Sequence, residues 1–251
     1  SYLKEYDIKT RPRVIPECTG SYGEGLIMVN EFEDMIMHTS SMNFEDYLKC
    51  RQFVLIVMVF HNTRLLKHIY KFLDCRMIKR STFFREIFNA SLTSESFAPV
   101  FDDFLNLTKG ELLDEAILPS DIDLDEITSN KIYKFLTIAL MKHQSCLIEI
   151  VTVALQKAEI NMSEEEIQFF TEMFENTFMS DIKIDRKTEI KNLPASISSI
   201  FDAETYEYFL TEYQLDRIDS LVTNYPKIED QENKLPYHLR PQNMVKTIRF
   251  A

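Results

Sequence analysis

The chain has 251 residues, 45% of them hydrophobic and 27% charged, which is enough for one large or two ordinary domains with a sizeable core. Its formal net charge of −12 argues against a nucleic-acid or anionic-membrane partner, because either would be repelled. The longest apolar run, residues 53–60, is far shorter than the ~20 residues that a membrane helix needs. We therefore expect a cytoplasmic protein with no nucleic-acid and no membrane partner.

The four cysteines, Cys18, Cys50, Cys75 and Cys146, lack the paired spacing of a disulfide framework. Scattered single cysteines are typical of a reducing compartment. The chain also lacks Cys-x-x-Cys spacing, and no Ser, Cys or Thr lies in a recognisable nucleophile elbow. No residue set therefore predicts catalysis by this chain alone.

Most of the strand-like sequence lies in the first 42 residues. Residues 11–16 carry prolines that bound a short strand, and residues 26–37 alternate imperfectly between apolar and polar side chains. The glycine-rich residues 20–25 predict a turn or loop between them, because glycine tolerates positive backbone angles. We interpret this segment as the tail of an α/β domain and expect its strands to lack their pairing partners in this chain.

From Asn43 onward the sequence reads as helix. Asn43 is a good N-cap residue, and Ser163 with Glu166 forms a capping-box pattern. A continuous apolar stripe over residues 131–157 predicts one helix about 40 Å long. Further helices are predicted at residues 65–73, 83–88, 98–107 and 211–220.

The predicted fold class is therefore mainly α, a multi-helix domain preceded by a short β/loop remnant. Three parts are expected: the strand and loop segment at residues 1–42, a helical domain at residues 43–223, and an extended arm at residues 224–251. Prolines and charged residues dominate the arm, and residues 245–250 are expected to add an edge strand.

An acidic segment resembles the start of a calcium loop. Asp121, Asp123 and Asp125 have the spacing of the first three EF-hand ligands. However, Glu126 lies where the loop needs glycine, and Ile132 lies where the bidentate acid belongs. A solvated acidic patch at a helix start is the better interpretation.

His61, His68 and Cys75 follow one another at seven-residue intervals, near one face of a helix. Zinc ligands on a helix lie three or four residues apart, and a seven-residue step spans ~10 Å along the axis. One metal ion cannot bridge that distance, so no metal site is predicted.

Two polar residues fall on apolar helix faces. His143 lies within the stripe of residues 131–157. It is predicted to be either a neutral core histidine or a proton donor in a pocket. Arg51 lies on the side of Tyr47 and Leu55, and a buried guanidinium needs a carboxylate or carbonyl partner. We expect Arg51 to be a structural clamp between the strand segment and the helical domain.

The first part of the chain resembles a known family. The resemblance rests on residues 6–16 (Tyr-Asp-Ile-Lys-Thr-Arg-Pro-Arg-Val-Ile-Pro), the loop at residues 20–25 and the acidic strand at residues 26–37. It continues with Met-Asn-Phe-Glu-Asp-Tyr at residues 42–47, Arg51 and the apolar helix. Together they are similar to the region that leaves the radical S-adenosylmethionine (radical SAM) barrel. The closer similarity is to the subgroup with an N-terminal cobalamin-binding domain.

The family's Cys-x-x-x-Cys-x-x-Cys cluster loop is absent from this chain, and the resemblance places it upstream of Ser1. The resemblance implies a 4Fe–4S cluster, S-adenosylmethionine and cobalamin in the parent protein, with no cofactor held by this chain. Only Arg13 and Glu17, at the end of the expected last strand, would lie at the edge of the cofactor pocket.

The resemblance implies that this chain is the carboxy-terminal helical portion of a radical SAM enzyme, which caps the barrel, binds substrate or mediates assembly. Its expected partners are the upstream domains of the same polypeptide and a second copy of the chain. The alternative is a stand-alone helical protein-interaction module without enzymatic activity.

Overall fold

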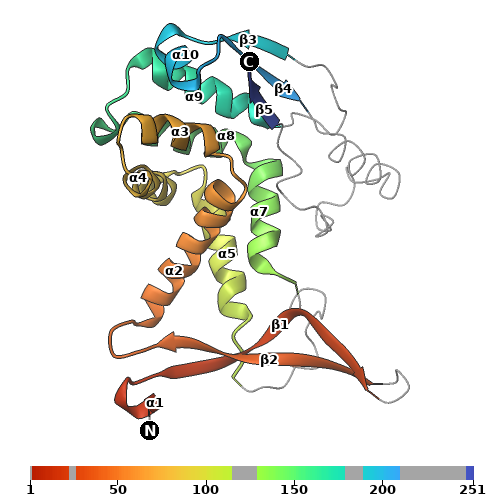
Figure 1. Ribbon diagram of the computed structural model, residues 1–251. Coiled ribbons are helices and arrows are strands. Elements are labelled where there is room, and N and C mark those ends of the chain that lie inside the picture. Colours follow the sequence, from red (N-terminus) through yellow and green to blue (C-terminus); the bar gives the residue numbers. More distant parts are fainter. Residues whose placement is uncertain (1, 23–26, 115–128, 179–188, 210–246) are drawn as a thin grey trace. The chain divides into compact units, whose positions relative to one another are not determined.

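The computed structural model describes residues 2–22, 27–114, 129–178, 189–209 and 247–251 (Figure 1). The chain groups into two compact units, which are described separately below. Unit 1 contains Ser1–Leu55 and Pro99–Phe135, and unit 2 contains Ile56–Ala98 and Leu136–Ala251. The three-part division expected from the sequence stays a prediction.

Unit 1 is built on a long β-hairpin. After the short helix α1 (Tyr2–Glu5), strands β1 (Lys9–Tyr22) and β2 (Ile27–His38) pair antiparallel with one another. Arg13 lies opposite Glu33 and Val14 lies opposite Phe32. The register shifts between Val14 and Thr19, next to Pro16, which cannot donate a ladder hydrogen bond.

The predicted fold class, mainly α with a β/loop remnant, is wrong. The described chain is mixed α/β, because five strands form two small antiparallel sheets beside the helices. The early strands do not lack partners, since β1 and β2 satisfy one another's backbone groups. Gly20, expected in a loop, pairs with Val29 inside the hairpin.

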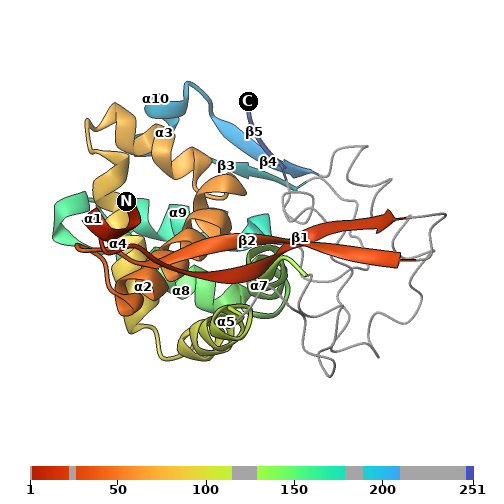
Figure 2. The ribbon, with the colours of Figure 1, turned by 90° about the horizontal axis from the view of Figure 1, so that it is seen from below.

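Helices α2 (Phe44–Ile56) and α5 (Ala98–Gly110) pack on one face of this hairpin (Figures 1 and 2). A first apolar cluster lies between the hairpin and the helices and comprises Tyr47, Leu48 and Leu112 with Met35, Met37, Met42, Phe44 and Leu105. A second cluster, of Val14, Leu113 and Phe32, lies on the opposite side of the strands, since neighbouring strand residues point to opposite faces. The Leu113 backbone N–H donates to the Pro12 carbonyl at 2.8 Å, so the chain after α5 runs along the edge of β1.

Unit 2 combines short helices with the second sheet. Its helices are η1 (Val57–Asn62), α3 (Lys67–Cys75), α4 (Arg80–Thr93), α8 (Gln144–Leu155), η2 (Ala158–Ile160), α9 (Glu164–Thr177), α10 (Ala195–Phe201) and most of α7 (Lys131–Lys142). Its strands are β3 (Glu189–Asn192), β4 (Thr205–Phe209) and β5 (Thr247–Phe250), paired antiparallel in that order.

Aromatic rings fill the core of unit 2. The Phe72 and Phe170 ring centroids lie 4.9 Å apart, edge to face, and both side chains are fully buried. Phe169 in turn lies 5.5 Å from Tyr206 of β4, which joins the sheet to helix α9. Such edge-to-face contacts are favoured by the ring quadrupoles and add to the burial of apolar area.

The single helix predicted over residues 131–157 is wrong. Helix α7 ends at Lys142, α8 begins at Gln144, and the two are bent by 89°. His143 lies at the bend with φ −124° and ψ 32°, outside the helical region. The apolar stripe continues because both helices bury one face, although their axes diverge.

Several local predictions are confirmed. The Asp46 backbone N–H donates to Asn43 Oδ1 at 3.0 Å, and Ser163 with Glu166 forms the complete capping box of α9. The expected strand near the carboxy terminus is β5, at the edge of the second sheet. The acidic segment at residues 121–126 and the helix expected at residues 211–220 lie outside the described residues.

Within the described ranges, no single helix has both the length and the apolar character to cross a membrane; α7 and α8 meet that test only when taken together, across their bend.

Candidate functional site

The most highly charged buried group of unit 1 is the Glu111 cluster, which we define as Arg13, Glu33, Arg51 and Glu111 with Tyr47 beside them. The strands supply Arg13 and Glu33, which face one another in the β1–β2 register. Helix α2 supplies Tyr47 and Arg51, four residues apart and therefore on one helix face. Glu111 follows α5 directly, and its backbone N–H still bonds to Leu107 at 3.0 Å, so it continues the last turn.

Glu111 joins the two arginines. Its Oε1 atom accepts from Arg13 Nη1 at 3.1 Å and from Arg51 Nη2 at 3.1 Å. Arg13 Nε donates to Glu33 Oε1 at 3.0 Å, which extends the network to the second strand. The Glu111 side chain is only 2% exposed, whereas that of Glu33 is 38% exposed. The cluster thus runs from a buried centre to the protein surface.

The charges of the cluster balance, with two guanidinium groups against two carboxylates. Burial by itself lowers the pKa of Arg13, but hydrogen bonds and charges from Glu33 and Glu111 outweigh it and raise the pKa above its ordinary value. Burial also raises the pKa of Tyr47, so its phenol stays neutral at physiological pH. Removing one carboxylate would leave a buried cation without compensation.

The geometry favours an anchoring role for Glu111 over acid–base chemistry. One carboxylate oxygen that two fixed guanidinium groups engage is poorly placed to accept a proton from a substrate. Arg51 also lies over the Phe104 ring, 5.8 Å from its centroid, which adds a cation–π contact to helix α5. Strand β1 and helix α2 therefore meet the segment after α5 at a single carboxylate.

The structure brings together Arg13 and Arg51, two of the residues singled out in the sequence. Arg13 and Arg51 share Glu111, a partner that the sequence analysis missed. Glu111 lies 98 residues from Arg13 and 60 from Arg51, so no local pattern connects them. Its one sequence signal is its spacing from Phe104 and Thr108, which places it on the buried face of α5. Glu17 lies in β1, and its side chain is outside the described part of the structure.

His61 and His68, which lie seven residues apart in the sequence, have different surroundings. His61 Nδ1 is 3.4 Å from the Tyr70 hydroxyl. The His68 ring packs against Phe250 at 4.9 Å, and burial, followed by the charges of Lys67 and Lys71, lowers its pKa to about 4. Across the residues that the structure describes, no group of three or more potential ligands is placed to hold a metal ion.

His143 lies beside a cysteine at the start of α8. Its Nδ1 atom is 4.0 Å from Cys146 Sγ, and that thiol points to the Ser96 carbonyl at 3.6 Å. Burial, with a smaller effect of Lys142, lowers the pKa of His143, so the imidazole is neutral at physiological pH. The sequence predicts His143 within the apolar face of one helix, but the residue lies at the bend between α7 and α8.

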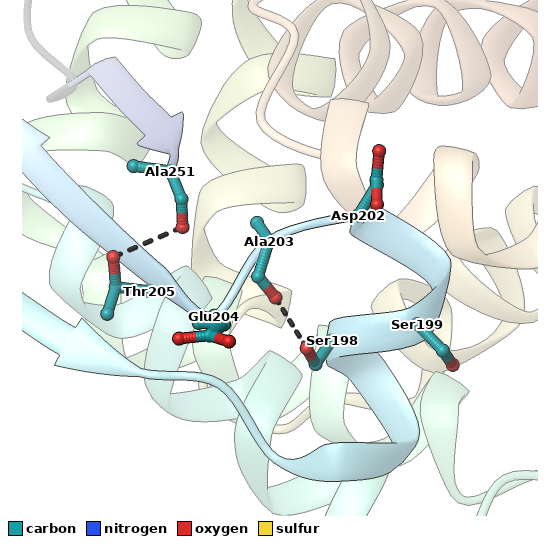
Figure 3. A pocket seen from close by; sticks show the side chains of 7 residues that line it. All are labelled: Ser198, Ser199, Asp202, Ala203, Glu204, Thr205 and Ala251. Carbon is teal, nitrogen blue, oxygen red and sulfur yellow. Dashed lines mark hydrogen bonds between the residues drawn. The ribbon is translucent and has the colours of Figure 1, made fainter.

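An open depression of about 620 Å³ lies between α10 and the end of β5 (Figure 3). Two of its hydroxyls already bond within the protein: Ser198 Oγ donates to the Ala203 carbonyl at 2.6 Å and Thr205 Oγ1 to the Ala251 carbonyl at 3.2 Å. Asp202 and Glu204 make its lining acidic. This depression lacks the enclosed, apolar lining that is typical of small-molecule sites.

The chain matches no known family model, and no curated protein sequence matches it.

Proposed function

We propose that this chain is the carboxy-terminal portion of a cobalamin-dependent radical SAM enzyme and acts there as a non-catalytic capping, substrate-binding or assembly part. Its partners in this proposal are the upstream domains of the same polypeptide and a second copy of the chain, in the cytoplasm. The cluster, S-adenosylmethionine and cobalamin are held by the upstream domains, with Arg13 and Glu17 near the edge of their pocket.

One observation carries this proposal beyond the resemblance itself. Two of the segments that resemble the family, residues 6–16 and the stretch from residue 42 to Arg51, meet in the Glu111 cluster. Arg13 comes from the first segment, and Tyr47 and Arg51 come from the second. The resembling residues thus belong to one buried network that fastens the hairpin to helices α2 and α5, which supports an architectural role.

The iron content of the protein tests this proposal. The chain should be expressed alone and also with the upstream part of its reading frame, and both proteins should be reconstituted anaerobically with iron and sulfide. The expected result is a colourless, iron-free chain and a longer protein that holds a stoichiometric cluster on a three-cysteine loop. A cluster in the chain alone, or a reading frame without such a loop, would contradict the proposal.

A second candidate is a helical protein-interaction module without enzymatic activity. Exposed apolar side chains at the start of the chain favour it: Tyr2 is 69% exposed, Leu3 57% and Tyr6 42%. Exposed apolar groups of this kind are common at protein-binding surfaces. An in-frame start codon shortly before Ser1 would favour the module over the enzyme.

A further inference from the structure

The two outer edges of the β1–β2 hairpin differ in their capacity to take a further strand. On the β1 edge, the Pro12 carbonyl already accepts from the Leu113 backbone N–H at 2.8 Å. Pro12 and Pro16 have no N–H to offer, and Pro16 lies within the register shift of β1. Strand β2 contains no proline, and in the described part of the chain β1 is its only paired strand. A strand edge of this kind is a template for pairing with another strand.

The register fixes which backbone groups of β2 face this open edge. The Pro12 carbonyl points away from β2, and Pro12 lies opposite Asp34. Residues that face one another without exchanging ladder bonds both direct their N–H and C=O groups outward, so those of Asp34 point to the open edge. The alternation of the strand extends this to Phe32 and Ile36. Asp34 is exposed and Ile36 is 46% exposed, so side chains at this edge are accessible.

The residue order of β2 selects the strand that fits this edge. Residues 27–37, Ile-Met-Val-Asn-Glu-Phe-Glu-Asp-Met-Ile-Met, show the same order of apolar, polar and aromatic types when read from either end. The centre of this near-palindrome is Phe32. Two copies of β2 that pair antiparallel about an axis at Phe32 place Asp34 opposite Asn30 and Met35 opposite Val29. Like side-chain types then meet across the pair, as a two-fold symmetric interface requires.

The charges of β2 allow this register. The opposed acids in it are Glu31 and Glu33 of the second copy, and the Glu33 carboxylate is already engaged by Arg13 Nε at 3.0 Å. Moving the axis by one residue sets Glu33 opposite itself and Asp34 opposite the Phe32 ring, which matches fewer types. The net charge of −12 on each chain opposes association, but this repulsion is screened beyond a Debye length of about 8 Å at physiological ionic strength.

We propose that two copies of this chain associate through the outer edges of β2, antiparallel about an axis at Phe32, to form one four-stranded sheet. A two-stranded sheet is marginally stable, and further strands stabilise it. The inference goes beyond the proposed function, because it stands on strand geometry and holds equally for an enzyme portion and for an interaction module. A chain that stays monomeric would overturn it and would leave the iron test unaffected.

Sedimentation equilibrium of the full chain tests the association itself. The expected result is a species with twice the mass of one chain that dissociates on dilution. Raising the salt concentration should strengthen the dimer, because the two acidic chains then repel one another less. A monomer at every protein concentration, or assemblies that grow beyond two copies, would overturn the proposal.

A pair of proline substitutions locates the interface. Asp34→Pro removes an N–H that points away from β1, so the hairpin keeps its ladder while each copy loses one donor to the other. The dissociation constant of the dimer should rise at least about tenfold, since two hydrogen bonds are lost in the dimer. Thr10→Pro is the matched control at the outer edge of β1 and should leave the dissociation constant unchanged. Equal effects of the two substitutions would contradict the proposal.

Glu31→Lys tests the register without disturbing the backbone. It replaces the two opposed pairs of acids by pairs of lysine and glutamate, so the dimer should become severalfold tighter. In the register centred on Glu33, residue 31 lies opposite Met35, and no such gain is expected. A dimer of unchanged or lower affinity in this variant would overturn the proposed pairing.

Discussion

Unit 1 and unit 2 are each stabilised internally by a different kind of interaction. Unit 1 fixes a two-stranded hairpin, a structure that is marginally stable by itself, with charged side chains that converge on Glu111. Unit 2 fixes its three-stranded sheet with aromatic rings, such as the Phe169–Tyr206 and Phe201–Phe250 pairs. The comparison shows that direction-dependent ion pairs can position a hairpin, whereas ring packing covers the second sheet, whose cross-strand Glu207–Arg249 ion pair of 3.1 Å is partly exposed to solvent.

The difference has an energetic consequence. Buried charges lose their hydration, and only well-placed partners offset that loss, so one missing partner is severe. Ring packing is spread over many contacts, so the loss of one ring is partly relieved by its neighbours. Unit 2 also has a buried carboxylate, that of Glu166, which accepts from the Ser163 backbone N–H to complete the cap of α9 and pairs with Arg76.

The largest effect is expected for Glu111→Ala. This substitution leaves the guanidinium groups of Arg13 and Arg51 without their shared carboxylate and should lower the free energy of unfolding by about 3–5 kcal/mol. Urea denaturation followed by circular dichroism measures it. Asp74→Asn is the matched control, because Asp74 pairs with Arg80 at the surface, and it should leave the unfolding curve unchanged. Equal effects of the two substitutions would mean that the Glu111 pairs are not the anchor of unit 1.

Phe170→Ala probes the aromatic core of unit 2. The fully buried ring lies 4.9 Å from Phe72 and 5.0 Å from Phe169, and its removal leaves a cavity. We expect the free energy of unfolding to fall by about 3 kcal/mol in the same urea experiment. This value is at the lower end of the range for Phe→Ala substitutions, because the adjacent rings can move into the space. The milder Phe170→Leu should recover most of this loss. A loss as large for leucine as for alanine would indicate that ring geometry, and not volume, dominates.

A pH titration sharpens the contrast further. His68 titrates near 6.5 in the unfolded chain and at about 4 in the folded protein, where burial disfavours its charged form. Between these values the unfolded chain binds the extra proton, so stability is lost as the pH falls from 6.5 to 4. The expected loss is about 2–3 kcal/mol relative to His68→Phe, measured as the difference between their unfolding free energies at each pH. Parallel pH profiles of the two proteins would contradict this.

The smallest effects, and the most similar between units, are expected at the helix caps. Asn43→Ala removes the cap of α2, and Ser163→Ala removes that of α9. Each should lower the free energy of unfolding by about 1 kcal/mol, because one backbone N–H at each helix start loses its acceptor. Ser199→Ala, at an exposed position inside α10, is the control. A large difference between the two caps would show that one helix is fastened mainly by its tertiary contacts.

Local features of the fold could be predicted from the sequence. The caps at Asn43 and Ser163 were found because the acceptor and the donor lie within three residues of one another. The sequence located the hairpin strands and a turn or loop between them, but their mutual pairing was not predicted, because the segment was interpreted as the tail of an α/β domain. The strand β4 was missed, although Tyr206 and Tyr208 alternate with less buried neighbours in the manner of a half-buried strand.

Features that depend on distant parts of the chain could not be predicted. The sequence predicts that Arg51 needs a carboxylate or carbonyl partner, but it does not indicate Glu111, which follows Lys109 and Gly110 in a pattern typical of a surface charge. The bend at His143 was hidden because helical periodicity reports which residues are buried and not the direction of the axis. The cofactor-edge role that the resemblance implies for Arg13 stays a prediction, and its bond to Glu111, 98 residues away, could not be predicted from any local pattern.

Hydrogen exchange tests most directly whether the Glu111 cluster fastens the hairpin to helices α2 and α5. Amide exchange should be compared between the unmodified chain and Glu111→Gln, which keeps the size of the side chain and removes its charge. We predict that β1 and β2 amides exchange at least about tenfold faster in the variant, while amides of α8 and α9 change little. Equal acceleration in both units, or an unchanged hairpin, would contradict this account.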